Sequence, residues 1–228
     1  DFELTTAPRG KEYLIVAVDG LIEPVGDYEI ILPGEGGVVD TDFTDSSSSN
    51  HTITRVGDTK HKTDKNKLGN SSIYFDGVGD SLSVGSADHT DWNFGANDWT
   101  MEAWILPTTD YPCIMGKWDT NGTTDNSCLF WVDTNTNKIK GYFQNNCNIS
   151  HVAGGGPTLY GTIPLTLNDR FYHVALQRNG DKIELYVDGV FDTSIDFVGS
   201  MCTSTQNFQI GNFGDHTFIT SPVHYKGY

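Results

Sequence analysis

One loop of the sequence combines the residue types that bind calcium. The segment KWDTNGTTDNS (117–127) places acidic and amide side chains around Gly122, namely Asp119, Asn121, Asp125 and Asn126. Calcium takes about six to eight oxygen ligands, commonly from Asp and Asn side chains and loop carbonyls. The D-x-N-G run allows a tight turn that brings such oxygens together, although the terminal bidentate Glu of an EF-hand is absent. The sequence therefore predicts either a bound calcium ion or a plain hydrophilic loop.

Four aromatic residues in or beside predicted loops could form a sugar site: Trp92, Tyr111, Trp118 and Tyr160. Aromatic faces pack on the CH groups of a sugar ring, while Asn or Asp side chains bind its hydroxyl groups. The alternative is that these rings pack over the edge of the protein core. Trp99, Trp104 and Trp131 fall inside predicted strands, and we expect them in the core.

Acidic side chains outnumber basic ones. The 228 residues include 30 Asp and Glu but only 14 Lys and Arg, which gives a formal net charge of −16. This charge argues against nucleic acid as a partner, and it suits a soluble surface, a divalent cation or a cationic partner. One basic cluster interrupts the acidic chain, and we expect it on a solvated edge strand and loops: Lys60, Lys62, Lys65 and Lys67.

No common catalytic motif or membrane span is present in the sequence. It has no GxSxG, HExxH or GxxxxGKS/T pattern, and no pair of its seven histidines has metal-ligand spacing. Asp76 and Asp80 in FDGVGD are expected to form turns, because Asp beside Gly favours them. The longest apolar run, Tyr13 to Val18, is far shorter than the about 20 residues that span a bilayer. The four cysteines include no CxxC pair, so disulfide bridges and buried free thiols both stay open.

Short β-branched or aromatic runs between turn signals predict an all-β protein. No window of a dozen residues shows helical periodicity. Asn179-Gly180 and Asp188-Gly189 predict tight hairpins, because these pairs accept the positive φ angles that such turns need. Residues 171–178 are mostly apolar on both faces, which is typical of a central strand. Strands are expected at 72–75, 81–84, 99–106, 128–132, 139–143, 171–178, 182–187 and 208–210.

The run PGEGG divides the chain into two parts. Three glycines in residues 33–37 predict a hinge at 34–37, because glycine-rich segments are flexible. Before it we expect a small β connector module at residues 1–33. After it we expect one large domain at residues 38–228, since the length allows a single large core.

The larger part resembles the laminin-G-like, concanavalin A-like jelly-roll family. Four motifs occur in the family's order: SIYFDGVGDSLSV (72–84), DWNFGANDWTMEAWILP (91–107), RFYHVALQRNGDKIELYVDGV (170–190) and FQIGNF (208–213). The resemblance implies a two-sheet antiparallel jelly-roll sandwich over residues 38–228. The family usually closes with a further strand, whereas this sequence stops at YKGY (225–228), so we expect the final strand to be missing.

The same resemblance implies a protein that is not an enzyme. Hydrolases of the superfamily carry several carboxylates on one strand, as E-x-D-x-x-E or a relative of it, because alternate residues share a face. Here Glu102 and Glu184 each stand alone, at positions that are structural in the family. His173 falls at a family position where a hydrogen-bonded histidine of the sheet is expected.

Residues 2–30 resemble a short β module of bacteriophage tail-fibre and virion proteins. The matching run is LIVAVDGLIEPVGDY (14–28). Together the two resemblances imply a non-catalytic virion surface or tail-fibre protein, at the virion or outside the cell, that presents its sandwich to a host glycan. Other virion proteins would be its partners, with a homotrimer possible. Two alternatives stay open: an architectural capsid-decoration or fibre-assembly subunit that binds no sugar, and a secreted bacterial adhesin or carbohydrate-binding module of a larger enzyme.

Overall fold

The chain is described as a computed structural model over residues 41–85, 90–108, 113–118, 125–133, 135–148, 156–212 and 225–228. The connector module predicted at residues 1–33 and the hinge predicted at 34–37 lie outside the described residues, so both stay predictions. No helix among the described residues is long and apolar enough to cross a membrane.

The described residues form strands and one short 3-10 helix, which confirms the all-β prediction. The elements are β1 (Ile53–Val56), β2 (Lys60–Lys62), β3 (Ser72–Asp76), β4 (Ser81–Val84), η1 (Thr90–Trp92), β5 (Trp99–Ile105), β6 (Cys113–Lys117), β7 (Cys128–Asp133), β8 (Lys138–Phe143), β9 (Thr158–Pro164), β10 (Tyr172–Asn179), β11 (Lys182–Val187), β12 (Val190–Asp196), β13 (Phe208–Ile210) and β14 (Lys226–Gly227).

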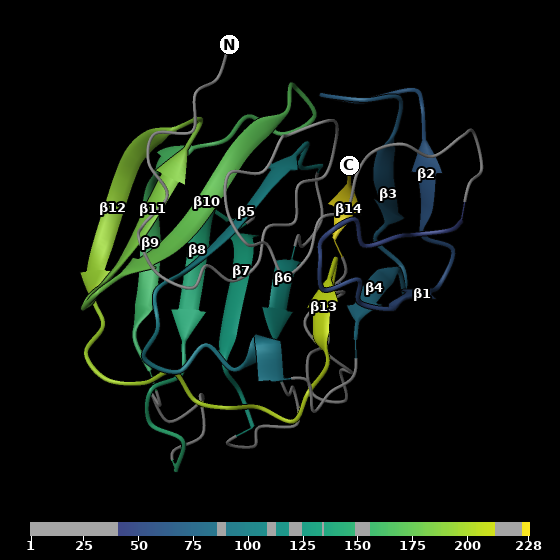
Figure 1. The fold of residues 1–228 in the computed structure, drawn as a ribbon. Coiled ribbons are helices and arrows are strands. Elements are labelled where there is room, and N and C mark those ends of the chain that lie inside the picture. Colours follow the sequence, from purple (N-terminus) through teal and green to yellow (C-terminus); the bar gives the residue numbers. More distant parts are fainter. Residues whose placement is uncertain are drawn as a thin grey trace.

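These strands form two packed layers (Figure 1). The back layer is a seven-stranded sheet in the order β1-β4-β13-β6-β7-β8-β9, and a four-stranded sheet in the order β12-β11-β10-β5 lies in front of it. A three-stranded sheet in the order β14-β3-β2 continues from β5, because the Leu106 N–H donates to the Tyr228 carbonyl at 2.7 Å. Every described strand pairing is antiparallel, which confirms the predicted sandwich.

Both predicted hairpins are present. Gly180 joins β10 to β11 with a φ of +60°, and Asp188 and Gly189 join β11 to β12 with φ values of +51° and +73°. Glycine and Asp tolerate this left-handed region better than most residues, which is why these dipeptides mark the turns. Strand β10 lies between β5 and β11, so its predicted central position is confirmed.

The core lies between the two layers. Along β10, Val174 and Leu176 are fully buried in it, while His173 and Ala175 occupy the opposite face of the sheet. The core is rich in large aromatic side chains, which contribute much of the buried apolar area: Trp92, Phe94, Trp99, Phe130, Phe143, Phe197 and Phe208.

A disulfide links two segments that are far apart in the sequence. Cys147, between β8 and β9, is bonded to Cys202, between β12 and β13. Cys113 and Cys128 are buried free thiols. The structure therefore combines both of the alternatives that the cysteine count left open.

The sequence does not predict β6 and β9, for different reasons. All five residues of β6 are buried, so it lacks the alternation that marks a half-buried strand. β9 contains Gly161 and Pro164, which usually signal turns, but an edge strand such as β9 tolerates both.

Candidate functional site

Three side chains form a row across the outer face of the back sheet. In the strand register, Trp131 of β7 is paired with Lys140 of β8, and Lys140 is paired with Tyr160 of β9. Their sequence neighbours, among them Val132 and Ile139, are buried in the core, and alternate residues of a strand point to opposite faces. The three side chains therefore point away from the core.

The row carries two aromatic rings with the Lys140 side chain between them. Tyr160 is 61% exposed and Trp131 is half-buried. The Lys140 Nζ lies 2.8 Å from Asp133 Oδ2 and 5.0 Å from the centre of the Tyr160 ring. We call the residues Trp131, Asp133, Lys140 and Tyr160 the β7–β9 face.

Asp133 is fixed by several donors. Its Oδ2 also accepts from Thr136 Oγ1 at 2.8 Å, and its Oδ1 accepts from the Asn135 N–H at 3.2 Å. Burial alone would raise the pKa of Asp133, but the hydrogen bonds from Lys140, Thr136 and Asn135 outweigh it and lower the pKa. The carboxylate therefore stays charged at neutral pH. It is only 8% exposed and already accepts from Lys140, Thr136 and Asn135, so its role in this structure is to hold Lys140 in place.

A buried aromatic cluster lies beside the row on the same face of the back sheet. Cys113, Trp118, Leu129 and Tyr142 form a second hydrophobic cluster, and Trp131 packs against it. The Trp118 and Tyr142 rings meet edge to face with centroids 4.9 Å apart. The Tyr142 hydroxyl donates to Gln144 Oε1 at 3.0 Å. This packing restricts the orientation of Trp131.

The four residues predicted for a sugar site lie in different surroundings. Tyr160 presents its ring to solvent on the β7–β9 face, and Trp118 lies in the buried cluster beside that row and is 6% exposed. Trp92 is fully buried in the core, where it stacks on Phe208, so its ring face is not accessible to a sugar in this structure. Tyr111 lies outside the described residues.

The expectation that all strand tryptophans lie in the core is wrong for two of them. Trp99 is fully buried, but Trp104 and Trp131 are half-buried on the outer faces of the front and back sheets. The alternation of side chains along β7 predicts the outward position of Trp131, because Phe130 and Val132 on either side of it are core residues.

Of the four residues predicted to bind calcium, Asp119 and Asn121 lie outside the described residues. Asn126 is fully buried. Asp125 accepts hydrogen bonds from the Thr205 N–H at 2.7 Å, from the Thr205 hydroxyl and from Gln206 Nε2 at 3.1 Å. Burial would raise its pKa, but these bonds outweigh it and lower the pKa. In this structure Asp125 joins its loop to the segment before β13.

A second acidic group lies where β1 and β3 end. Carboxylate oxygens of Asp58, Asp76 and Asp80 lie within 4.8 Å of one another, which suits a hard cation such as calcium. Asp80 is fully buried and accepts from the backbone N–H groups of Asp58 at 2.7 Å and Asp76 at 2.9 Å. Burial raises the pKa of Asp80 to about 6. The backbone bonds agree with the prediction that Asp76 and Asp80 form turns.

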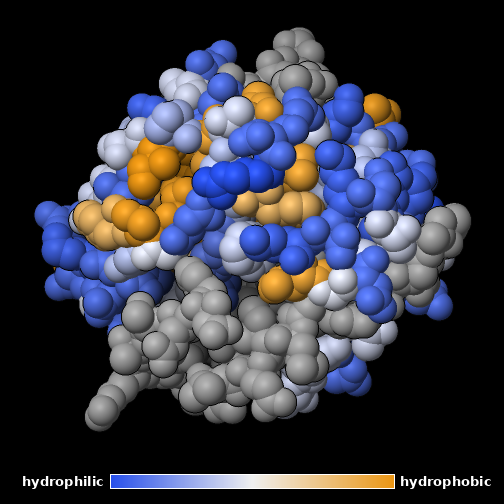
Figure 2. Space-filling view, turned by 90° about the horizontal axis from the view of Figure 1, so that it is seen from above, coloured by the Kyte–Doolittle hydropathy of each residue, from blue (hydrophilic) through white to orange (hydrophobic). Residues whose placement is uncertain are grey.

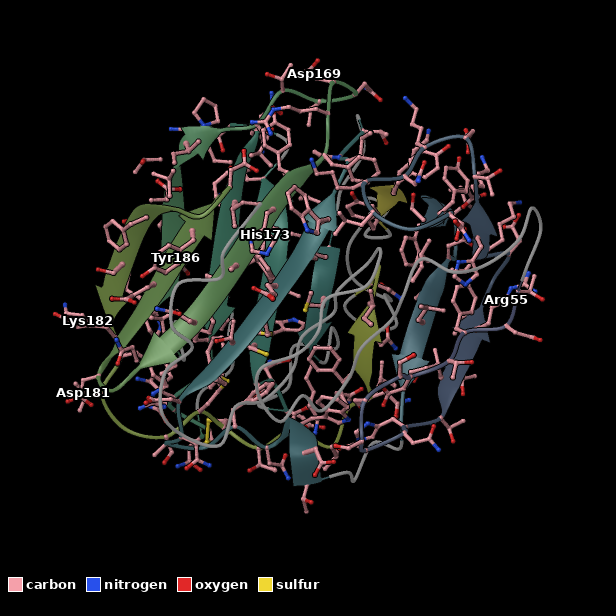
Figure 3. The ribbon with its side chains drawn as sticks, turned by 45° about the horizontal axis from the view of Figure 1, so that its top comes forward. Arg55, Asp169, His173, Asp181, Lys182 and Tyr186 are labelled. Atoms are coloured by element: carbon pink, nitrogen blue, oxygen red, sulfur yellow. A yellow bond between two sulfur atoms is a disulfide. The ribbon has the colours of Figure 1, made fainter. Side chains whose placement is uncertain are left out.

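The outer face of the front sheet carries His173 and Tyr186 side by side (Figure 3). His173 Nε2 lies 3.3 Å from Glu102 Oε2, which fits the expected partnered histidine of the sheet. Glu184 Oε2 accepts from Gln177 Nε2 at 2.6 Å and from the Tyr186 hydroxyl at 3.0 Å. Each glutamate is thus held by neighbours on the sheet.

Comparison with known proteins agrees with the sandwich architecture. Residues 76–219 match the family model Laminin_G_3, described as the concanavalin A-like lectin/glucanases superfamily, and the match covers more than half of the chain. The chain belongs to this family. The matched residues include strands β7, β8 and β9 and all four strands of the front sheet. None of the curated proteins matches the chain.

Solved structures share the fold at low sequence identity. Domain 4 of AbnA, an extracellular arabinanase from Geobacillus stearothermophilus, is 15% identical with a TM-score of 0.52, and the match covers 80% of this chain and 81% of that one. Domains LG4-5 of the mouse laminin alpha1 chain are 13% identical with a TM-score of 0.49, over 82% of this chain and 40% of that one. The likeness to the AbnA domain concerns the fold alone.

Proposed function

We propose that this laminin-G-like domain is a non-catalytic module that binds carbohydrate on the β7–β9 face. The observation that carries the proposal is the row of Trp131, Lys140 and Tyr160 across three neighbouring strands. Neighbouring strands are about 4.8 Å apart, so the two aromatic residues are about 10 Å apart. That distance is close to the length of two linked sugar rings. The aromatic faces would pack on sugar CH groups, while Lys140, which Asp133 holds in place, donates to hydroxyl groups.

A solved relative supports the proposal. The AbnA domain was determined in complex with arabinotriose, so a domain of this fold can hold an oligosaccharide. The same likeness favours one of the alternative settings, a carbohydrate-binding module attached to a polysaccharide-degrading enzyme. The Cys147–Cys202 disulfide fits an extracellular location, because disulfides persist in oxidising environments.

The virion role is a second setting for the same activity. It rests on the resemblance of residues 2–30 to a tail-fibre module, which lies outside the described residues. In that setting the sandwich would bind a host glycan, and other virion proteins would bind the connector module. Purified protein would then block phage adsorption to host cells. An architectural subunit would instead bind only to particles that lack it.

The sugar site can be tested on a glycan array with three variants. Tyr160→Ala removes the exposed ring and should weaken binding about tenfold, since one aromatic contact contributes roughly that factor. Tyr160→Phe keeps the ring and should bind nearly as well as the native protein. Phe191→Ala is the matched control, because Phe191 is also an exposed aromatic residue but belongs to the other sheet. Absence of binding by the native protein on a broad array would contradict the proposal.

We also propose a calcium ion, either in the loop at 117–127 or at the group Asp58, Asp76 and Asp80. Calorimetric titration after chelator treatment should show binding, together with a rise in melting temperature. Asp119→Asn should abolish binding if the loop holds the ion, and Asp58→Asn should do so if the second group holds it. No heat and no melting shift in the native protein would end the calcium proposal.

A further inference from the structure

The few basic side chains of this acidic protein are concentrated in one segment. Residues 55–67 hold five of the 14 Lys and Arg residues and only two acidic residues, a net charge of +3 in a chain of −16. The five are Arg55, Lys60, Lys62, Lys65 and Lys67. A local excess of positive charge attracts an anion to this segment.

The fold puts this segment on an exposed edge. β2 is the outermost strand of the β14-β3-β2 sheet (Figure 1). His61, in the middle of β2, is buried and stacks on Phe43 with ring centroids 4.7 Å apart. Since side chains alternate along a strand, Lys60 and Lys62 point to the other face. The described surface on the β2 and β3 side is mostly hydrophilic (Figure 2).

Aromatic rings lie beneath two of the lysines. The Lys62 Nζ is 3.5 Å from the centre of the Tyr74 ring and 5.7 Å from that of Tyr228. The Lys67 Nζ is 4.7 Å from the centre of the Trp104 ring on β5. A cation over an aromatic face is attracted by the ring, so both ammonium groups are held in place while keeping their charge.

Carboxylates neutralise this surface only in part. Lys60 lies 3.5 Å from Asp58, in a pair whose side chains are 31% and 60% exposed, and such exposed pairs are weak. Tyr228 donates its hydroxyl to Asp64 at 2.7 Å, which places that carboxylate beside the ring. Lys62 forms no ion pair with a carboxylate of the described residues.

We propose that this surface, which we call the β2–β5 face (Lys60, Lys62, Lys67, Tyr74 and Trp104), binds an acidic polysaccharide. The lysines would pair with carboxylate or sulfate groups of the chain, and the rings would pack on its sugars. The surface matches a short charged segment of such a chain, because the basic surface is one strand and its following loop, and the rest of the protein, with a net charge of −19, repels any polyanion that extends far beyond it.

This inference goes beyond the proposed function, because it concerns another sheet and a charged ligand. Trp131, Lys140 and Tyr160 belong to the back sheet, whereas β2, β3 and β5 belong to the other two sheets. Either face can bind its ligand without the other. Tyr160→Ala should therefore leave acidic polysaccharide binding unchanged, and loss of lysines from β2 should leave the glycan-array result unchanged.

The test is isothermal titration with three probes: an oligogalacturonate, a sulfated heparin oligosaccharide and a neutral galactan oligosaccharide. We expect the native protein to bind at least one acidic probe. Any binding of the neutral probe should be weakened by Tyr160→Ala and unchanged by the loss of Lys62 and Lys67. The two acidic probes separate carboxylate from sulfate recognition. Raising the salt from about 0.1 M to about 1 M shortens the screening length from about 10 Å to about 3 Å and should weaken the binding severalfold.

Variants locate the binding. The double substitution Lys62→Gln and Lys67→Gln should weaken the acidic probe about tenfold, since each exposed charge contributes about a factor of three. The control with the same charge change is Arg170→Gln with Lys182→Gln, because both side chains are about half exposed, Arg170 just before β10 and Lys182 at the start of β11. Its affinity should stay within about twofold of the native value.

Three results would overturn the proposal. One is that neither acidic probe binds the native protein. Another is an equal loss of affinity in the Arg170 and Lys182 control, which would show a general charge effect. The third is tighter binding of a single-stranded oligonucleotide than of both acidic sugars, with the same loss in the Lys62 and Lys67 variant.

Discussion

Single charged side chains fix the positions of loops in this domain. Arg178 is 2% exposed and donates to three backbone carbonyls: Gly95 at 2.9 Å, Gly180 at 2.9 Å and Gly199 at 2.7 Å. Burial lowers the pKa of its guanidinium, but the group stays charged because its normal pKa is so high. One side chain thus joins the β10–β11 turn to two loops that are distant in sequence.

Removing the guanidinium should be costly. We expect Arg178→Met to lower the free energy of unfolding by about 3 kcal/mol, because three carbonyls lose a charged donor and stay buried. Arg178→Lys should be intermediate, since an ammonium group cannot copy the planar fork. Urea unfolding followed by tryptophan fluorescence measures both. A loss below about 1 kcal/mol for the Met variant would contradict this role.

Asp133 gives a prediction with a pH dependence. Its pKa is lowered in the folded protein, so it stabilises the fold above its unfolded pKa near 3.8, and this stability is lost as the pH falls through the lower folded value. Asp133→Asn should cost about 1–2 kcal/mol at pH 7. The difference from the native protein should shrink below about pH 4. Urea unfolding at pH 7 and pH 3.5 checks it, and a constant difference would refute the assignment.

At the scale of elements, alternation along strands decides what each surface presents. β7 directs Phe130 and Val132 into the core and Trp131 outward, and β2 directs His61 inward and its lysines outward. The two proposed binding faces are consequences of this alternation combined with the strand order. A shift of one residue in register would bury the lysines and expose His61.

The β10–β11 turn allows a test of the predicted hairpin. Gly180 has a φ of +60°, and a Cβ added there would have no heavy atom within 4 Å. Any loss of stability on substitution of Gly180 therefore reports on the backbone conformation alone. Gly180→Val should lower the free energy of unfolding by about 1–2 kcal/mol, because β-branched residues disfavour this region. Gly180→Asn should cost much less, since Asn tolerates positive φ. Equal costs for Val and Asn would argue against the turn conformation.

At the scale of the whole molecule, distant segments are held together by a covalent link and by sheet pairing. The Cys147–Cys202 bridge closes a separation of 55 residues, and β14 near the C-terminal end pairs with β3. Charge is also organised at this scale. The basic side of β2 lies in an otherwise acidic protein, and Figure 3 shows Arg55 on that side, away from Lys182 at the opposite edge.

Loss of the disulfide should destabilise the whole domain. A bridge that closes about 55 residues restricts the unfolded chain, so the double substitution Cys147→Ser and Cys202→Ser should cost about 2–4 kcal/mol. Cys113→Ser is the comparison, because that thiol is buried but free. Melting under non-reducing conditions compares the variants. If a reducing agent leaves the native melting temperature unchanged, the bridge does not contribute.

Local signals in the sequence were enough for the fold class and most strands. The β10, β11 and β12 hairpins follow from runs of alternating residues joined by Asn-Gly and Asp-Gly. β6 escaped prediction because it is buried on both faces and β9 because it contains Gly and Pro. Of the predicted sugar residues, Tyr160 lies on the candidate site, and its partner Trp131 was assigned to the core.

The sequence alone thus determined an all-β chain of a recognisable family, an acidic charge and one basic cluster, because these depend on composition and on neighbours along the chain. Only the tertiary structure decided which rings share a face. Trp131 and Tyr160 share a face because β8 pairs with both of their strands. The Lys67 ammonium group lies over the Trp104 ring, although Lys67 follows β2 and Trp104 belongs to a different sheet. Such contacts depend on strand order and register, which are set by packing between residues far apart in sequence.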